Sequence, residues 1–311
     1  MDVSEIRQTV DRFRILIIGR ANAGKTTILQ RICKTRENPE IYNSAGQKRG
    51  VHNIENEMMF RNNPGFVFHD SCGFEAGGQS EFDEMKAFIA SRSKEGRLND
   101  RIHVIWYCIP MDEDGRCFTE GEVKFFSQCD TGSIAVIVLF TKFDALYDDE
   151  FAELTNKGVS RQDAKTLAPQ HVKDAFANGP QVQLLYSRKG NQRPPRCHIC
   201  LPDMDKDDAD CGVLIERTAE ILDDETLKQL FVSTQRTNLE VCMRYALKMT
   251  LARHLDFSQI ISSHIPGKSG RQIINDLGLW FPYTSRHRQE EDEMWSTLRF
   301  SACPIAHSPS A

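Results

Sequence analysis

A short segment near the start of the chain combines glycine and alanine with one lysine and one threonine. It spans residues 19–26, reads Gly-Arg-Ala-Asn-Ala-Gly-Lys-Thr, and lies between an aliphatic run and an amphipathic stretch. Backbone N–H groups of such a loop can surround an anion at a helix N-terminus. Lys25 can then neutralise β- and γ-phosphate oxygens as the catalytic residue, and the Thr26 hydroxyl can coordinate Mg²⁺. The predicted nucleotide-binding residues of this loop are Gly19, Ala21, Asn22, Ala23, Gly24, Lys25, Thr26 and Thr27.

A second candidate for the phosphate and metal site follows the next apolar run. Asp70 closes the run 65–69 and opens the sequence Asp-Ser-Cys-Gly, which ends at Gly73. A carboxylate at this place can order the Mg²⁺ shell, and the glycine N–H can contact a γ-phosphate. Asp112 opens a second Asp-x-x-Gly match. Because Asp70 follows the phosphate loop by the span of one helix and a hairpin, we predict Asp70 as the second metal residue and Mg²⁺ as the cofactor.

The tetrapeptide Thr-Lys-Phe-Asp directly follows the apolar run 134–140. Asp144 could accept hydrogen bonds from both the N1–H and the exocyclic amine of guanine, a pair of donors that adenine does not offer. The aliphatic stem of Lys142 could cover the face of the base. The alternative is an ordinary solvated turn after a strand. With a phosphate loop upstream, we predict a guanine site that includes Thr141, Lys142 and Asp144.

These motifs lie at the ends of apolar runs that alternate with amphipathic stretches. The runs interpreted as strands are 14–18, 65–69, 102–109 and 134–140, and stretches with helical spacing include 25–33, 81–91 and 120–128. Such alternation predicts an α/β fold, in which helices cover both faces of a mostly parallel sheet. Ligands then bind at the carboxyl ends of the strands.

Together, these motifs in this order and spacing resemble the P-loop GTPase superfamily, specifically its translation-factor-related branch, and most closely a group of fungal G-domain proteins. The resemblance covers residues 12–253. It implies a three-layer G domain that binds GTP or GDP with Mg²⁺ and hydrolyses GTP to GDP and phosphate. Asn or Thr begins the base motif in this family, so Thr141 fits the pattern.

The chain after the base motif predicts a less regular organisation. Residues 148–224 contain a polar helical stretch and a Pro-rich stretch, which we interpret as an insertion in the G domain. A short strand at 230–232 and a helix over 238–253 would then complete the domain. Residues 254–311 are expected to form a small C-terminal extension that is partly helical or loosely ordered.

By the resemblance, the last guanine-binding loop should follow the last strand and precede the last helix. This places it at Ser233, Thr234 and Gln235. The rival position is the segment 187–189, which no clear helix follows.

Two departures from the family pattern concern hydrolysis. The first switch usually supplies a Thr to Mg²⁺, but residues 37–60 contain none, so Ser44 or the segment 52–55 would have to replace it. A Gln that orients the attacking water often follows the Asp-x-x-Gly motif, whereas Phe74 stands there. The side chains that could take this role, although each is more often structural, are His69, Glu75 and His52. We therefore expect slow or partner-dependent turnover.

Three functions are compatible with these residues. The favoured one is a GTP/GDP switch that signals to a protein effector through its phosphate-side loops. The second is a GTP-binding scaffold that assembles through its G domain, for example as a homodimer, without significant turnover. The third is an adenine-nucleotide kinase or ATPase, which would leave Asp144 without a role.

Composition limits the class of protein. The 311 residues are 40% hydrophobic and carry a formal net charge of −5, so no nucleic-acid partner is expected. The start of the sequence lacks the features of a signal peptide, and no apolar run approaches the roughly 20 residues of a transmembrane helix. We expect a cytoplasmic protein whose ten cysteines are reduced.

Two further clusters have ordinary and functional interpretations. Cys197 and Cys200, with Cys211 nearby, have a spacing that zinc sites use, but a second pair is absent and we favour ordinary cysteines. The aromatic residues at 280–283, with Trp295, could contact a partner or a lipid surface. Covering the apolar surface of the domain itself is the favoured interpretation.

Overall fold

The structure is a computed structural model, and it describes most of the chain as far as residue 254. The described residues are 10, 12–43, 45–49, 53–71, 79–94, 97–112, 118–187, 194–234 and 238–254. The predicted C-terminal extension lies outside them, apart from its first residue.

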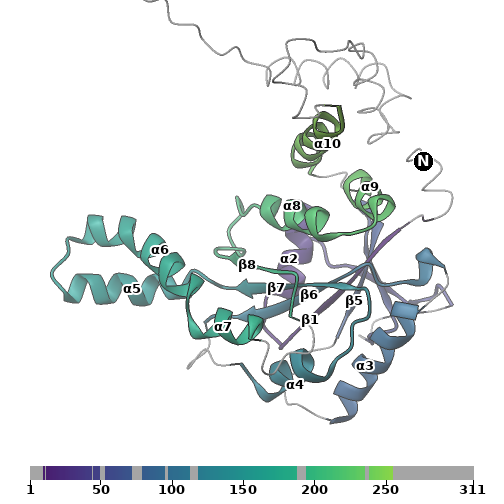
Figure 1. The fold of residues 1–311 in the computed structure, drawn as a ribbon, viewed down its shortest axis with the longest axis horizontal. Helices are drawn as coiled ribbons and strands as arrows, with labels where there is room; N and C mark the ends of the chain where they lie inside the picture. The colour runs from purple at the N-terminus through teal and green to yellow at the C-terminus, as the bar shows by residue number, and fades with distance from the viewer. Residues whose placement is uncertain are drawn as a thin grey trace, which may run out of the picture.

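One sheet of eight strands forms the centre of the described structure (Figure 1). The strands are β1 (Phe13–Gly19), β2 (Glu40–Tyr42), β3 (Lys48–Arg49), β4 (Glu57–Phe60), β5 (Asn63–Asp70), β6 (Val104–Pro110), β7 (Ala135–Thr141) and β8 (Cys197–Leu201). Their order is β3-β2-β4-β5-β1-β6-β7-β8. The five strands from β5 to β8 are parallel, whereas β4, β2 and β3 pair antiparallel at one edge.

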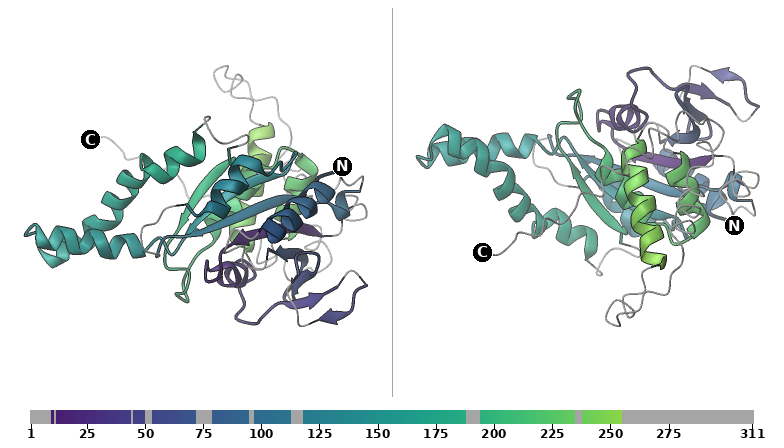
Figure 2. Two further views of the ribbon diagram at one scale, coloured as in Figure 1. Left: turned by 90° about the horizontal axis from the view of Figure 1, so that it is seen from below. Right: turned by 90° about the horizontal axis from the view of Figure 1, so that it is seen from above.

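Helices cover both faces of this sheet (Figures 1 and 2). They are α2 (Lys25–Ile32), α3 (Gln79–Lys94), α4 (Glu120–Gln128), α5 (Ala145–Asn156), α6 (Arg161–Ala177), α7 (Pro180–Tyr186), α8 (Gly212–Ile221), α9 (Glu225–Thr234) and α10 (Leu239–His254), with a short 3₁₀ helix at Leu98–Asp100. Helices α2, α8, α9 and α10 pack on one face, and α3, α4 and α7 on the other. None of the described helices is long and apolar enough to cross a bilayer.

The strand sequences explain the three layers. In β1, Ile15 and Ile17 join the core on the α2 side, while Leu16 and Ile18 join the core on the α3 side. Side chains alternate between the two faces of a strand, so a continuously apolar strand requires helices on both faces. The predicted α/β fold with a mostly parallel sheet is confirmed.

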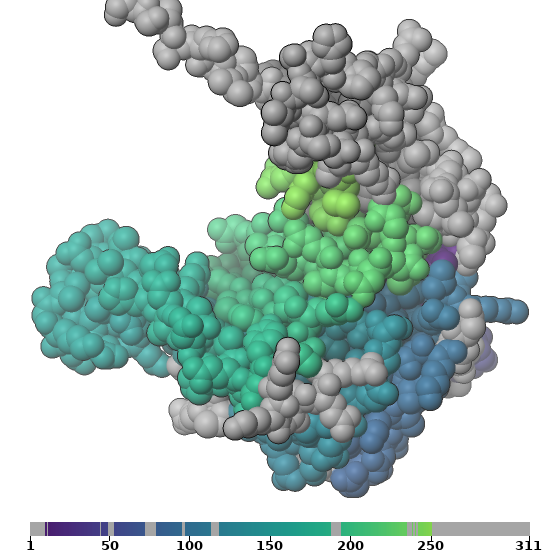
Figure 3. Space-filling view, viewed as in Figure 1, coloured from purple at the N-terminus to yellow at the C-terminus, as the bar shows by residue number. Residues whose placement is uncertain are grey.

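Helices α5 and α6 form a hairpin that projects from the sheet (Figures 1 and 2), and the space-filling view shows it as a separate lobe (Figure 3). Leu154, Ala164 and Ala168 form its small core. The end of α6 returns to the main body, where Val172 and Phe176 join the core on the α3 side. The hairpin therefore leaves the sheet directly after the base motif and returns to it before β8.

The sequence interpretation was wrong about residues 230–232, which belong to α9 and not to a strand. Leu227, Leu230 and Phe231 have helical spacing and pack together on the α2-side core. The last described strand along the chain is β8, which lies inside the segment interpreted as an insertion. Helix α8 of the same segment packs on the sheet. A three-residue apolar run does not distinguish a strand from a turn of helix, because its neighbours decide the period.

Candidate functional site

The predicted phosphate loop connects β1 to α2. Its chain turns through left-handed conformations at Asn22 (φ 59°) and Gly24 (φ 75°), and α2 begins at Lys25. The Lys25 Nζ atom lies over the loop, 2.7 Å from the Gly19 carbonyl oxygen and 3.0 Å from the Arg20 carbonyl oxygen. Backbone donors at a helix N-terminus and one ammonium group thus surround a single concave turn, which suits a phosphate group.

Glycine is required at the first position of this loop. Gly19 has a φ of 151°, and a Cβ atom there would lie 2.5 Å from the Cys108 carbonyl oxygen on β6. No side chain fits that approach, so the start of the loop can lie directly against the neighbouring strand.

An ion pair fixes the loop from the α4 side. Arg20 Nε lies 3.0 Å from Glu122 Oε1, and the two side chains are 12% and 2% exposed. Glu122 also forms a capping box with Thr119 at the start of α4. Burial raises the pKa of the Glu122 carboxyl, although its hydrogen bonds and the Arg20 charge oppose that shift. The loop and α4 therefore form one connected unit.

Asp70 lies at the carboxyl end of β5, beside the phosphate loop. Its Oδ1 atom is 3.7 Å from Lys25 Nζ. The rival Asp112 instead pairs with Lys142, at 2.6 Å between Oδ2 and Nζ. Of the two Asp-x-x-Gly matches, the structure therefore brings the first to the lysine of the phosphate loop. Gly73, predicted to contact the γ-phosphate, lies outside the described residues.

The oxygen donors at this point suit Mg²⁺. Thr26 is exposed at the start of α2, and Asp70 provides a carboxylate beside the lysine. The neighbouring Ser71 Oγ is buried, and no hydrogen-bond partner for it occurs among the described residues. Hydroxyl and carboxylate oxygens are the ligands that hard cations prefer, so Thr26 and Asp70 fit the predicted ion, and Ser71, next to Asp70 in the chain, is an additional oxygen.

The base motif is tied directly to the phosphate loop. Thr141, at the end of β7, donates from Oγ1 to the Ala23 carbonyl oxygen over 2.9 Å, and both residues are buried. Lys142 then adopts a left-handed conformation (φ 51°), and Asp144 occupies the N-cap position of α5. Because β1, β6 and β7 are parallel, Lys25 and Asp144 both follow the carboxyl ends of their strands, and this hydrogen bond joins the two loops.

The loop after β8 lies against Asp144. The Asp203 backbone N–H donates to Asp144 Oδ1 over 2.8 Å. Sequence reasoning missed this loop, because the five residues of β8 lie within the Pro-rich stretch. The available signal was the alternation of Ile199 and Leu201, both buried, directly before Pro202.

Ser233 and Thr234 do not reach this site. They are buried in the last turn of α9, where both hydroxyl groups donate to the Leu230 carbonyl oxygen. A Cβ atom on Gly65 would lie 2.6 Å from Thr234 Cγ2. Gly65 is near the amino end of β5, the opposite end from Asp70, so the prediction of a guanine loop at these two residues is wrong. Gln235 lies outside the described residues.

Part of this chain is similar to known proteins. Residues 14–142, which include the phosphate loop and the start of the base motif, match the family model described as 50S ribosome-binding GTPase. The matched part of the chain is similar to P-loop GTPase domains. A solved structure similar to it is the septin GTPase domain from Chlamydomonas reinhardtii, with 14% identity over 69% of this chain and 71% of that chain and a TM-score of 0.33. The search of curated proteins finds no match.

Two buried histidines have structural roles. His69 is fully buried, and its Nδ1 lies 2.9 Å from the Ile54 carbonyl oxygen. His103 Nδ1 accepts from the Arg14 backbone N–H, and Nε2 donates to the Leu98 carbonyl oxygen. Burial lowers the pKa of each imidazole to about 4. His69, a candidate for orienting water, is therefore a neutral core residue; Ser44, His52, Phe74 and Glu75 lie outside the described residues.

The cysteines among the described residues do not form a metal site. Cys197 and Cys200 are three residues apart on β8, so their side chains join the cores on opposite faces of the sheet. No cluster of three or more His, Cys, Asp or Glu ligands occurs among the described residues. The cysteines described there are free thiols, and burial raises their pKa, as for Cys211 to about 12.

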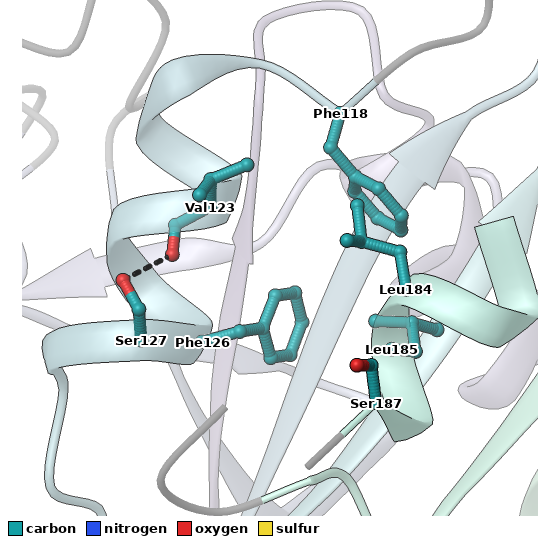
Figure 4. A pocket seen from close by; sticks show the side chains of 7 residues that line it. All are labelled: Phe118, Val123, Phe126, Ser127, Leu184, Leu185 and Ser187. Atoms are coloured by element: carbon teal, nitrogen blue, oxygen red, sulfur yellow. Dashed lines mark hydrogen bonds between the residues drawn. The ribbon is translucent and has the colours of Figure 1, made fainter. Parts of the chain in front are cut away.

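Ser187, the first residue of the rival guanine loop, lies in a cavity apart from the phosphate loop and the base motif. It lines an apolar cavity of about 140 Å³ between α4 and α7, into which Phe126 and Leu185 point (Figure 4). Neither the phosphate loop nor the base motif contributes to this lining. The other two residues of the rival segment lie outside the described part of the chain.

Proposed function

We propose that this chain is a Mg²⁺-dependent GTPase that acts as a GTP/GDP switch with slow intrinsic hydrolysis. The observation that supports this best is the buried hydrogen bond from Thr141 to the Ala23 carbonyl oxygen. It joins a candidate base motif and a candidate phosphate loop at the carboxyl ends of neighbouring parallel strands, so one nucleotide could contact both.

Each site residue then has a role that its chemistry allows. Lys25 and the loop amides stabilise charge that develops on the β- and γ-phosphate oxygens. Thr26 and Asp70 would hold Mg²⁺, which would neutralise phosphate charge. Asp144 accepts two hydrogen bonds from guanine, and the loop 202–205, whose Asp203 N–H donates to Asp144, is the segment that would lie beside the base.

The proposal of slow hydrolysis rests on two departures from the family pattern and on one buried histidine. Segment 37–60 contains no Thr, and Phe74 stands where related proteins carry a water-orienting Gln. His69 is buried, and its Nδ1 atom is hydrogen-bonded to the Ile54 carbonyl oxygen. These observations also favour the second candidate function, a GTP-binding scaffold without significant turnover. A protein effector, a G-domain homodimer and a cytoplasmic location remain predictions.

Nucleotide exchange and chromatography test the first part of the proposal. Purified full-length protein is loaded with Mg·GTP and an equimolar amount of ATP, and the bound nucleotide is analysed over time. We expect guanine nucleotide that converts slowly from GTP to GDP. Persistent GTP would favour the scaffold, whereas bound adenine nucleotide would contradict the guanine assignment.

An exchange of base specificity tests Asp144 directly. Xanthine presents N1–H and a 2-keto oxygen, so the amide of Asp144→Asn can pair with it as donor and acceptor. The variant keeps an oxygen that can accept from the Asp203 N–H. We expect its preference to move from GTP to XTP. Asp148→Asn, exposed one turn further along α5, is the matched control and should keep the preference for GTP.

A further inference from the structure

Arg31, in the last turn of α2, donates two hydrogen bonds to the loop that follows β8. Its Nε lies 2.9 Å from the Met204 carbonyl oxygen, and its Nη2 lies 2.8 Å from the Asp205 carbonyl oxygen. The side chain thus joins the helix that begins at the phosphate loop to the loop that lies against Asp144.

The same loop is held from its other side by the base motif. Asp144 Oδ1 accepts from the Asp203 N–H, and the Asp203 carbonyl oxygen accepts from the Lys206 N–H over 3.0 Å. Asp203 has a φ of 55°, a conformation that a non-glycine residue keeps where its surroundings hold it. Because each peptide unit is planar, these contacts and those of Arg31 fix four consecutive units, from 202–203 to 205–206.

We infer that Arg31 is a positioning residue for guanine recognition. This rests on the proposed function, because the loop 202–205 is then one wall of the base pocket. Arg31 acts through that loop: by holding two carbonyl groups it keeps the backbone beside Asp144 in the conformation that receives the base. Without Arg31 the loop gains alternative conformations, and the bound nucleotide must restrict them at a cost in affinity.

The neighbouring Arg36 provides a matched control. It lies a few residues beyond α2 and also reaches the segment after β8, but its partner is the side chain of Asp207. Both side chains of that pair are 76% exposed. An exposed ion pair between side chains does not hold the loop backbone, so its loss should leave the base pocket unchanged.

The test compares Arg31→Gln with Arg36→Gln and the wild type, all as full-length protein with Mg²⁺. The dissociation rate of a ribose-labelled fluorescent GDP and the affinities for GDP and ADP are measured. ADP carries the same phosphates but a base that does not match Asp144. We expect Arg31→Gln to release GDP about tenfold faster, with an unchanged affinity for ADP, so that the preference for GDP falls about tenfold.

Arg31→Lys is the second variant, because it keeps the charge and can reach one carbonyl oxygen. An intermediate loss of preference supports the inference. An unchanged GDP preference in both Arg31 variants overturns it, and so does an equal loss of GDP and ADP affinity, which would mean that Arg31 acts on the phosphate loop. A wild type that does not prefer GDP to ADP would instead overturn the proposed function, and the inference with it.

Discussion

Replacement of Thr141 by valine should weaken both the fold and nucleotide binding. Valine has nearly the shape of threonine but lacks the hydroxyl that donates to the Ala23 carbonyl oxygen over 2.9 Å. Thr141 is 2% exposed and Ala23 is 1% exposed, so water cannot take over the lost hydrogen bond without a rearrangement. The variant therefore withdraws a donor from a buried acceptor and leaves the packing otherwise intact.

The size of the effect follows from that burial. A buried polar group that loses its partner costs about 1–3 kcal/mol in free energy of unfolding. For a domain of this size, each kcal/mol lowers the melting temperature by roughly 2–4 °C. Since the same bond sets the base motif against the phosphate loop, we also expect GDP affinity to fall by about tenfold, which corresponds to ~1.4 kcal/mol.

Thermal unfolding without nucleotide and the dissociation rate of fluorescent GDP measure the two effects separately. Thr141→Ser is the control, because it retains the hydroxyl and loses only a methyl group. The serine variant should keep a GDP dissociation rate close to that of the wild type. If Thr141→Val matched Thr141→Ser in both measurements, the hydrogen bond would not be what joins the two motifs.

Two further predictions concern buried charge and protonation. Glu122→Ala removes the buried carboxylate that pairs with Arg20 and should lower the free energy of unfolding by about 3 kcal/mol in urea titrations. The control is Glu120→Ala, on the exposed side of α4, which should leave the unfolding midpoint unchanged. Equal behaviour of the two variants would count against a structural role for the ion pair. The pKa of His103 is about 4 in the folded protein, below its ordinary 6.5, so between these values the unfolded chain binds more protons and stability rises with pH, by up to ~1.4 kcal/mol per pH unit. This contribution to stability is complete above pH 6.5 and is lost as the pH falls to 4. His103→Gln should reduce the slope of the free energy of unfolding against pH between these values, measured by urea unfolding. An unchanged slope would refute the lowered pKa of His103.

The sequence by itself determined the contiguous parts of the site. The phosphate loop depends on residues 19–26, whose glycine and alanine positions, lysine and threonine are adjacent in the chain. The alternation of apolar runs and amphipathic stretches likewise predicted the layered α/β fold, because burial on both faces leaves a continuous apolar pattern within each parallel strand.

The tertiary structure decided which distant segments complete the site. Chain order favoured the first of the two Asp-x-x-Gly matches, and the strand order brings Asp70, and not Asp112, to Lys25. The strand β8 was missed because it is short and its apolar residues are mixed with cysteine and histidine. Residues 197–201 are a strand because they pair with β7.

The physical reason is the range of the interactions. Turn conformations and helix starts depend on neighbours within a few residues, so residue types and spacing predict them. Strand pairing and the contact from Arg31 to Met204 join groups that are far apart in the chain, and many segments could satisfy the same local pattern. Local chemistry thus predicted a candidate phosphate site, and the packing of the whole sheet determined which segments lie beside Asp144.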